Sequence, residues 1–379
     1  MMERIILSLA HMGGTEQKYV AEAFETNWIV PLGPLVNEFE HRLEKFLGTD
    51  HVVALSAGTA AVHLALVMLG VGKGDEVICQ SFTFSASANP IRYCGAEPVF
   101  VDSESQTWNM DPEVLETAIK ERKRITGKYP KAIIPVYLYG MPAKIDEIMA
   151  VAAKYGIPVV EDSAEALGSD YKGKKCGTFG EYGVLSFNGN KLITTSGGGA
   201  LVCPSAEAAE RVKFFATQAR ENRPYYYHEH IGYNYRLSNV SAGIGCGQME
   251  VIEDHLARRR EIHGLYVRAL SGIDGIDVHD NPSPDFNSNF WLTTITLDPE
   301  VISTTPDELR LALDANNIES RLLWRPMHIQ PVYSDSPYYG GTVAEDLFAR
   351  GLCLPSGSSL SDADIARVVE TILSSVKRR

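Results

Sequence analysis

Short apolar runs alternate with amphipathic stretches over about the first 200 residues of the chain. The runs are bounded by turn residues and predict buried strands. These strands are expected over residues 51–55, 76–79, 98–101, 131–136, 157–161, 184–187 and 200–203. The stretches between them repeat apolar residues at helical spacing and predict helices. These helices are expected over residues 15–26, 35–46, 60–69, 85–93, 112–123, 144–155 and 205–219. The alternation predicts an α/β fold with a mostly parallel sheet covered by helices on both faces.

The pattern changes after residue 219. Residues 220–236 are aromatic and irregular, and residues 238–270 read as one long helix that connects two parts of the chain. The remainder predicts a smaller α+β unit, with a strand over 290–297 and helix starts at Thr305 and Ser361. We therefore expect a large domain over residues 1–245 and a small C-terminal domain over residues 246–379.

Composition excludes several classes of function. The chain has 35 basic and 48 acidic residues, a net charge of −13, which disfavours nucleic-acid binding. No apolar run approaches the roughly 20 residues of a membrane span, and the acidic start does not resemble a signal peptide. The six cysteines form no C-x-x-C pair and the histidines no H-E-x-x-H motif, so no metal site is predicted. These features indicate a cytoplasmic protein with reduced thiols.

One lysine stands out by its position. Lys191 lies between the predicted strands 184–187 and 200–203, and the glycines at 197–199 permit a tight return between them. A lysine held against the core is partly desolvated, which lowers its pKa and makes it a nucleophile able to form a Schiff base. The ordinary alternative is a surface lysine on a hairpin loop.

Other polar residues fall at strand ends, where α/β proteins bind ligands. Ser56-Ala-Gly-Thr59 joins a strand to a helix, so it is either a phosphate site at the helix N-terminus or a simple cap. Asp162 ends a strand, where it either caps a turn or pairs with a protonated pyridine nitrogen. Ser186 is either a second phosphate ligand or a strand hydroxyl.

Taken together, these residues resemble the DegT/DnrJ/EryC1/StrS family of sugar aminotransferases. Its members have the aspartate aminotransferase-like fold (fold type I) and bind pyridoxal 5′-phosphate (PLP). Nearly the whole chain shares the resemblance. Its most specific parts are His11-Met-Gly-Gly14, Glu161-Asp-Ser-Ala-Glu-Ala-Leu-Gly168, residues 186–199, Gln218-Ala-Arg-Glu-Asn222 and Gly232-Tyr-Asn-Tyr-Arg-Leu-Ser-Asn239. Within the family the chain most resembles the UDP-N-acetylbacillosamine-type transaminases.

The resemblance implies roles for individual residues at the cofactor. Lys191 would form the Schiff base with PLP, and Asp162 would hold the pyridine nitrogen. The phosphate ligands would be Gly58, Thr59 and Ser186. Phe82 would stack on the ring, whereas from the residues alone Phe82 or Phe84, just past a strand, is more often a core residue. Glu165 stands where many relatives carry histidine or glutamine, and we expect it to be partly protonated beside the cofactor's O3′.

The resemblance also implies partners. Asn234 would reach the phosphate bound by the neighbouring subunit, which requires a homodimer with a shared active site. Trp28 and His328 would meet the nucleotide sugar. An acidic protein needs local basic groups to face its diphosphate; the candidates are Arg220, Arg236, Arg321 and Arg325, which could instead form solvated ion pairs.

The implied activity is transfer of an amino group from L-glutamate to C4 of a UDP-linked 4-keto-6-deoxy-N-acetylhexosamine. Family relatives that are dehydrases lack the lysine, so its presence favours transamination. Two alternatives remain at this stage. One is a PLP-binding regulatory protein without turnover. The other is a doubly wound nucleotide-binding enzyme without PLP, which the absence of G-x-G-x-x-G after a strand disfavours.

Overall fold

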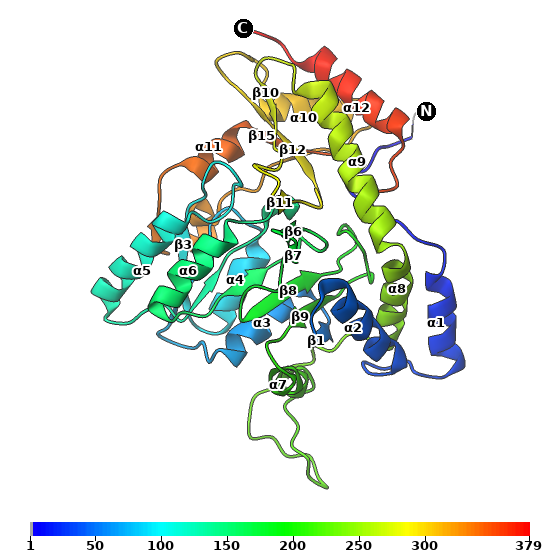
Figure 1. Ribbon diagram of the computed structural model, residues 1–379, viewed down its shortest axis with the longest axis vertical. Coiled ribbons are helices and arrows are strands. Elements are labelled where there is room, and N and C mark those ends of the chain that lie inside the picture. The colour runs from blue at the N-terminus through cyan, green and yellow to red at the C-terminus, as the bar shows by residue number, and fades with distance from the viewer. Residues whose placement is uncertain (1–2) are drawn as a thin grey trace.

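The computed structural model describes residues 3–379. Two four-stranded sheets, β1-β9-β8-β5 and β14-β3-β2-β4, are joined by parallel bridges between β4 and β5 at Ile133–Val159 and Val136–Asp162. They form one twisted sheet at the centre of the large domain (Figure 1). Its strands are β1 (Val52–Leu55), β2 (Glu76–Gln80), β3 (Glu97–Val101), β4 (Ala132–Ile134), β5 (Val160–Asp162), β8 (Tyr182–Ser186), β9 (Gly199–Val202) and β14 (Tyr338–Tyr339).

The sheet is mostly parallel, as predicted. Strand β9 is the exception, because it runs antiparallel to both β1 and β8. The chain returns antiparallel after β8, as predicted, but the connection to β9 is a long loop over residues 187–198 and not a tight turn, and this loop carries Lys191. Since β5 and β8 are parallel neighbours, their carboxyl ends place Asp162 and Ser186 at the same edge of the sheet.

Helices cover both faces of this sheet. The helices are α2 (Pro34–Leu47), α3 (Gly58–Met68), α4 (Ser85–Tyr93), α5 (Pro112–Thr126), α6 (Ile145–Tyr155) and α7 (Ala206–Ala216), whereas α1 (Glu16–Glu25) packs on a later helix and not on the sheet. Neighbouring residues of β2 point to opposite sides: Val77 packs in the apolar cluster with α3 and α4, and Ile78 in the cluster with α5 and α6. The caps agree with the sequence, since the Asp111 and Ser205 side chains accept backbone N–H bonds at the starts of α5 and α7.

The predicted single helix over residues 238–270 is wrong in one respect. The chain forms α8 (Asn239–Glu250) and α9 (Ile252–Leu270), with a break at Val251, whose φ and ψ are −119° and 9°. Helix α8 packs on α1 and α2, whereas α9 packs on the small domain (Figure 1). The domain boundary predicted at residue 245 falls inside α8, and the change of packing partners occurs at Val251.

The small domain is built on an antiparallel sheet in the order β10-β12-β15-β13. Its elements are β10 (Ile276–Val278), β12 (Thr293–Leu297), α10 (Pro306–Ala315), β13 (Arg321–Leu322), α11 (Val343–Arg350), β15 (Gly351–Leu354) and α12 (Asp362–Ser375). The predicted capping boxes at Thr305 and Ser361 are confirmed. Ile5 pairs with Ile318 and packs in this domain's core, so the N-terminal segment crosses from the small to the large domain.

The remaining short elements lie between and beside these units. They are β6 (Asp170–Tyr171), β7 (Lys174–Lys175), β11 (Phe286–Asn287) and the 3-10 turns Leu138–Gly140, Met327–Ile329 and Pro331–Tyr333. Over residues 3–379, no helix combines the length and the apolar character that a membrane span requires.

Candidate active site

A cavity of about 390 Å³ opens at the carboxyl ends of β1, β5 and β8. The predicted residues Gly58, Thr59, Asp162, Glu165, Ser186 and Lys191 all line it. They follow three strands, β1, β5 and β8, and meet because these strands belong to one sheet, in the order β1-β9-β8-β5. The fold therefore brings the predicted lysine, the two acids and the predicted phosphate ligands together.

Lys191 is held over the cavity by its loop. Its backbone N–H donates to the carbonyl of Asn188, and its side chain is 14% exposed. The amine Nζ lies 3.5 Å from Glu165 Oε1 and 4.0 Å from the centroid of the Trp291 ring. The lysine predicted from its sequence position is thus a nearly enclosed amine between a carboxylate and an aromatic face.

Asp162 ends β5 with its carboxylate already oriented. Ser87 Oγ donates to Oδ2 at 2.6 Å, and the N–H of Ala164 donates to Oδ1 at 3.1 Å. Burial raises the pKa of Asp162, and the Ser87 hydrogen bond opposes that effect. A buried carboxylate needs a positively charged partner. The fixed carboxyl group of Asp162 in the cavity wall therefore suits a protonated ring nitrogen, which would provide that charge.

Glu165 lines the same cavity as Asp162. Its Oε2 accepts the backbone N–H of Tyr139 at 2.7 Å, and its Oε1 faces Lys191. Burial raises the pKa of Glu165, nearby Lys191 lowers it, and the Asp162 charge raises it again. The upward direction agrees with a partly protonated Glu165, whose role at O3′ stays a prediction.

The N-terminus of α3 forms the other end of the cavity. The helix begins at Gly58 with no side-chain cap, so its first N–H groups are open to an anion. A Cβ added at Gly58 would lie 3.1 Å from Ser186 Cβ, so glycine permits the close approach of the two loops. Within the described residues no protein group bonds the hydroxyls of Thr59 or Ser186, which leaves both free to contact a phosphate.

Two buried polar atoms beside the cavity also lack partners within residues 3–379. They are the amide oxygen of Asn190 and the indole N–H of Trp324, and both residues line the cavity. Buried polar groups normally have a partner, so these two are suited to a polar ligand. The amine, the acidic pair, the helix N-terminus and these orphaned atoms together fit PLP with a polar substrate.

The phenylalanine that lines the cavity is Phe84, and not Phe82, which the resemblance implied. Phe82 is fully buried, packs edge-on against Tyr139 and does not line the cavity. Phe84 is 54% exposed, lies beside Trp324 and lines the wall. Both phenylalanines lie just past β2, between Gln80 and Ser85, and their side chains differ in direction: that of Phe82 is buried and that of Phe84 is exposed at the cavity.

The predicted basic residues divide into three groups. Arg321 lines the main cavity, and Arg325 lines an adjoining cavity of about 270 Å³. The two cavities share Thr83, Phe84 and Trp324. Arg236 is instead bound to Glu40 at 2.7 Å.

His328 lies outside both cavities. Its side chain is 8% exposed, with Nδ1 at 2.6 Å from Ser81 Oγ and Nε2 at 3.1 Å from Glu345 Oε1. The ring also stacks on Tyr338. In this chain His328 joins the large domain to α11 and lines neither of these two cavities, so its contact with the nucleotide sugar stays a prediction.

Trp28, Arg220 and Asn234 also lie away from the cavity of their own chain. Trp28 is 39% exposed in the connection between α1 and α2. Arg220 and Asn234 are exposed in the segment after α7, which extends away from the body of the molecule (Figure 1). Within one subunit, these three residues do not complete the site.

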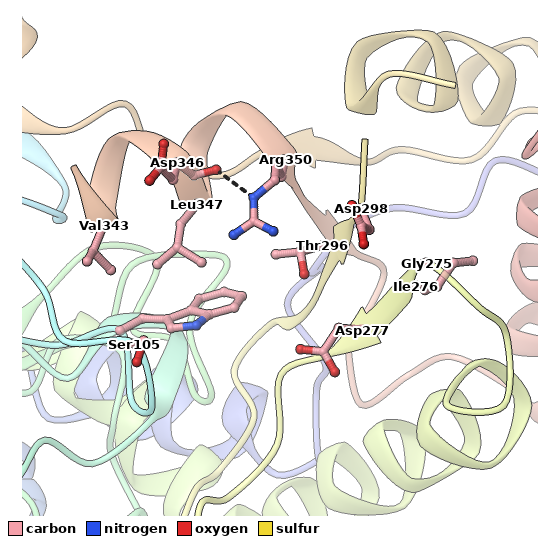
Figure 2. A pocket seen from close by; sticks show the side chains of 11 residues that line it. Ser105, Gly275, Ile276, Asp277, Thr296, Asp298, Val343, Asp346, Leu347 and Arg350 are labelled. Carbon is pink, nitrogen blue, oxygen red and sulfur yellow. Dashed lines mark hydrogen bonds between the residues drawn. The ribbon is translucent and has the colours of Figure 1, made fainter. Parts of the chain in front are cut away.

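A second cavity, of about 500 Å³, lies between the small domain and the residue 105–108 turn. Asp277, Asp346 and Arg350 line it, and Arg350 Nε donates to the carbonyl oxygen of Asp346 (Figure 2). It shares no lining residue with the Lys191 cavity. The predicted catalytic and cofactor-binding residues therefore do not line this cavity of about 500 Å³.

The fold and the site define an aminotransferase of fold type I that uses PLP. The chain belongs to the DegT/DnrJ/EryC1/StrS aminotransferase family, whose model matches residues 10–373. It is 51% identical over 377 residues to EpsN of Bacillus subtilis, a pyridoxal phosphate-dependent aminotransferase by name, covering 98% of this chain and 96% of EpsN.

Two further comparisons agree. The chain is 38% identical to the GDP-perosamine synthase of Caulobacter vibrioides, with 98% of each protein covered. It superposes with a TM-score of 0.88 and 32% identity on the crystal structure of a DegT/DnrJ/EryC1/StrS aminotransferase from Brucella abortus, covering 95% of this chain and 94% of that one. The predicted family, fold type, enzyme class and cofactor are confirmed.

Proposed function

We propose that the protein transfers an amino group from L-glutamate to C4 of a UDP-linked 4-keto-6-deoxy-N-acetylhexosamine. The observation that carries this proposal is the single cavity in which the Lys191 amine, the Asp162 carboxylate and the open N-terminus of α3 face one another. The relatives that the chain matches over nearly its whole length support a nucleotide-sugar substrate.

PLP, when bound, supplies an electron sink for the negative charge that develops on the donor. The protein's residues supply position and proton transfer. Lys191 Nζ takes the proton from Cα of L-glutamate and later returns one to C4 of the sugar. Asp162 keeps the ring nitrogen protonated, and the hydroxyls of Thr59 and Ser186 hold the phosphate with the first N–H groups of α3.

The nucleotide end of the substrate needs positive charge, because the protein as a whole carries a net charge of −13. Arg321 in the main cavity and Arg325 in the adjoining one are the groups placed to meet a diphosphate. The two cavities share three lining residues, so a sugar in the first can continue into a nucleotide in the second.

The same arrangement is open to a GDP-linked sugar, which the similarity to GDP-perosamine synthase favours. The experiment offers the purified enzyme ¹⁵N-glutamate with a UDP-linked or a GDP-linked 4-keto-6-deoxy sugar and measures ¹⁵N in the sugar product by mass spectrometry. We expect label in the UDP-linked sugar and none with the Lys191→Ala variant. If only the GDP-linked sugar is labelled, the substrate carries GDP and not UDP. If neither sugar is labelled, both assignments are rejected.

A homodimer with a shared site is the second part of the proposal. It is supported by the exposure of Asn234 and of the segment around it, where Tyr226 is 80% and Ile231 85% exposed. Large apolar side chains exposed together are typical of a protein–protein interface. We propose that this segment packs on a second copy of the chain and brings Asn234 to the phosphate bound there.

A further inference from the structure

Trp291 forms the wall of the active site behind Lys191, and sequence reasoning assigned it no role. It is 1% exposed and precedes β12 of the small domain. The Lys191 amine lies over its ring, 4.0 Å from the centroid, well within the range at which an ammonium group is attracted to an aromatic face. The residue thus touches the atom that performs the chemistry.

Both ends of Trp291 are fixed. Its indole N–H donates to the carbonyl of Asn190 at 2.7 Å, which is the peptide group next to Lys191. Ser8 Oγ donates to that same carbonyl oxygen at 2.7 Å. The carbonyl of Trp291 itself accepts a hydrogen bond of 2.6 Å from Arg259 Nη1. The ring cannot shift without breaking bonds to the lysine loop.

Arg259 is a buried arginine that fixes the position of Trp291. It lies on α9, is 1% exposed, and has no carboxylate partner within the described part of the chain. It instead donates to the carbonyls of Trp291, Ser356 and, at 3.4 Å, Lys191. Burial lowers the pKa of Arg259 to about 10, so the guanidinium stays charged at neutral pH. Its hydrogen bonds fix the small-domain loops against the lysine loop.

We propose that Trp291, fixed by Arg259, holds the Lys191 amine whenever that amine is not bonded to the cofactor. Transamination requires the lysine to be released and retained in the site, so the inference rests on the proposed aminotransferase activity. A released ammonium in this enclosed site loses most of its water and needs compensation. The Trp291 ring supplies part of it at 4.0 Å from Nζ, and Glu165 Oε1 contributes at 3.5 Å.

The experiment measures the reactivity of the released lysine and not turnover. Full-length protein is saturated with pyridoxamine 5′-phosphate, which leaves Lys191 free, and is treated with an amine-acetylating reagent at pH 8. Peptide mass spectrometry then gives the rate of labelling at Lys191. Trp291→Leu removes the aromatic face that holds the amine in place, and we expect labelling roughly fivefold faster than in the wild type.

Two controls separate this effect from a wider cavity. Trp291→Phe keeps an aromatic face and should label within about twofold of the wild type. Trp324→Leu widens the same cavity without removing the ring under Nζ and should also stay near the wild-type rate. Equal labelling of Trp291→Leu and the wild type, or equal acceleration in all three variants, would overturn the proposal.

A second measurement does not depend on the folding of Trp291→Leu. Fluorinated tryptophan incorporated throughout the chain weakens the attraction of each ring for a cation and preserves its shape. Labelling of Lys191 should accelerate with the number of fluorine atoms in the wild-type background and stay constant in Trp291→Phe. If the labelling rate does not depend on fluorination, the role of Trp291 is contradicted. The ¹⁵N-transfer result, and hence the proposed function, would stay intact.

Discussion

At the scale of single residues, the main feature of the site is a pair of carboxyl groups buried near a lysine. Asp162 and Glu165 are both nearly inaccessible, and burial raises the pKa of each. They differ in their other partners: Asp162 accepts from Ser87, and Glu165 accepts from the Tyr139 backbone and faces Lys191. Two similar carboxyl groups can therefore hold different protonation states at one pH.

Glu165 provides the first prediction. If its raised pKa keeps it partly protonated near the cofactor, Glu165→Gln retains a neutral donor and should keep most of the activity. Glu165→Ala should shift the absorbance of the bound cofactor, because the donor is lost. The wild-type absorbance should also change as rising pH deprotonates Glu165, and Glu165→Gln should remove that change. Absorbance titrations of the three proteins decide the matter, and an unchanged spectrum and unchanged turnover in Glu165→Ala would refute the role.

His255 provides a prediction about pH and stability. It stacks on His11 with the ring centroids 4.6 Å apart, and its Nδ1 is buried with no partner among residues 3–379. Burial lowers its pKa from 6.5 to about 4, with smaller effects from His11, Arg259, Asp254 and the Leu192 backbone. Because the folded pKa is depressed, the unfolded chain takes up the proton first as pH falls.

The stability that neutral His255 preserves is therefore fully present above pH 6.5 and is lost as pH falls toward 4. We expect this single group to account for about 2 kcal/mol over that interval once solvent screening is allowed for. Urea unfolding of the wild type and of His255→Gln at pH 7, 5 and 4 measures it. The variant should lose less stability on acidification, and parallel losses would show that His255 does not titrate in this way.

At the scale of elements, the start of α3 and the end of β8 form one anion site from two parts of the chain. Gly58 allows the two to approach, since a Cβ there would meet Ser186. A hydrogen bond from a hydroxyl to a charged phosphate is stronger than one between neutral groups. Ser186→Ala should therefore weaken PLP binding roughly tenfold, as measured by equilibrium dialysis.

Ser205→Ala is a matched control, because Ser205 is also a serine at the edge of an element but caps α7 by accepting from Ala208. It should lower stability by about 1 kcal/mol and leave PLP affinity unchanged. Equal PLP affinity in Ser186→Ala and the wild type would remove Ser186 from the phosphate site.

Elements were predictable where the signal is local. Strand β2 and helix α4 follow from an apolar run and from helical spacing, and the caps at Thr305 and Ser361 follow from adjacent residues. The break at Val251 was not predictable, because the helical pattern continues through it. The methyl groups of Val251 lie close to Gly13, a residue far away in sequence, and only the fold brings the two together.

The site residues also divide into those that the local sequence predicts and those that depend on long-range contacts. Lys191 and Asp162 could be found because each follows a recognisable strand, and resemblance to a family supplied their roles. The burial of Phe82, the pairing of His328 with Ser81 and Glu345, and the position of Trp291 under Lys191 depend on long-range contacts. A large tryptophan just before a β-rich run was the one signal that could have pointed to the last of these.

At the scale of the whole molecule, one subunit holds the lysine, the acids and the start of α3 but leaves Asn234 exposed where it bridges Thr217, beside the segment that extends beyond α7 (Figure 1). That segment follows α7 after two non-glycine residues with positive φ, Gln218 and Ala219, which turn the chain outward. A segment of this kind in the free subunit exposes apolar side chains to water. Packing against a second subunit would bury them and would complete the site at the same time.

This arrangement predicts complementation between two defective proteins. Lys191→Ala lacks the amine, and Asn234→Ala lacks the group that we propose to act on the partner's phosphate, so each homodimer should be inactive or nearly so. In a heterodimer, one site carries both substitutions and the other carries neither. Refolding the two variants together at equal amounts should therefore restore about a quarter of wild-type activity, since half of the dimers are mixed and each has one intact site. Sedimentation should show a dimer at the same concentrations. A fully active monomer, or a mixture no more active than its components, would place Asn234 outside the shared site and contradict the two-chain arrangement.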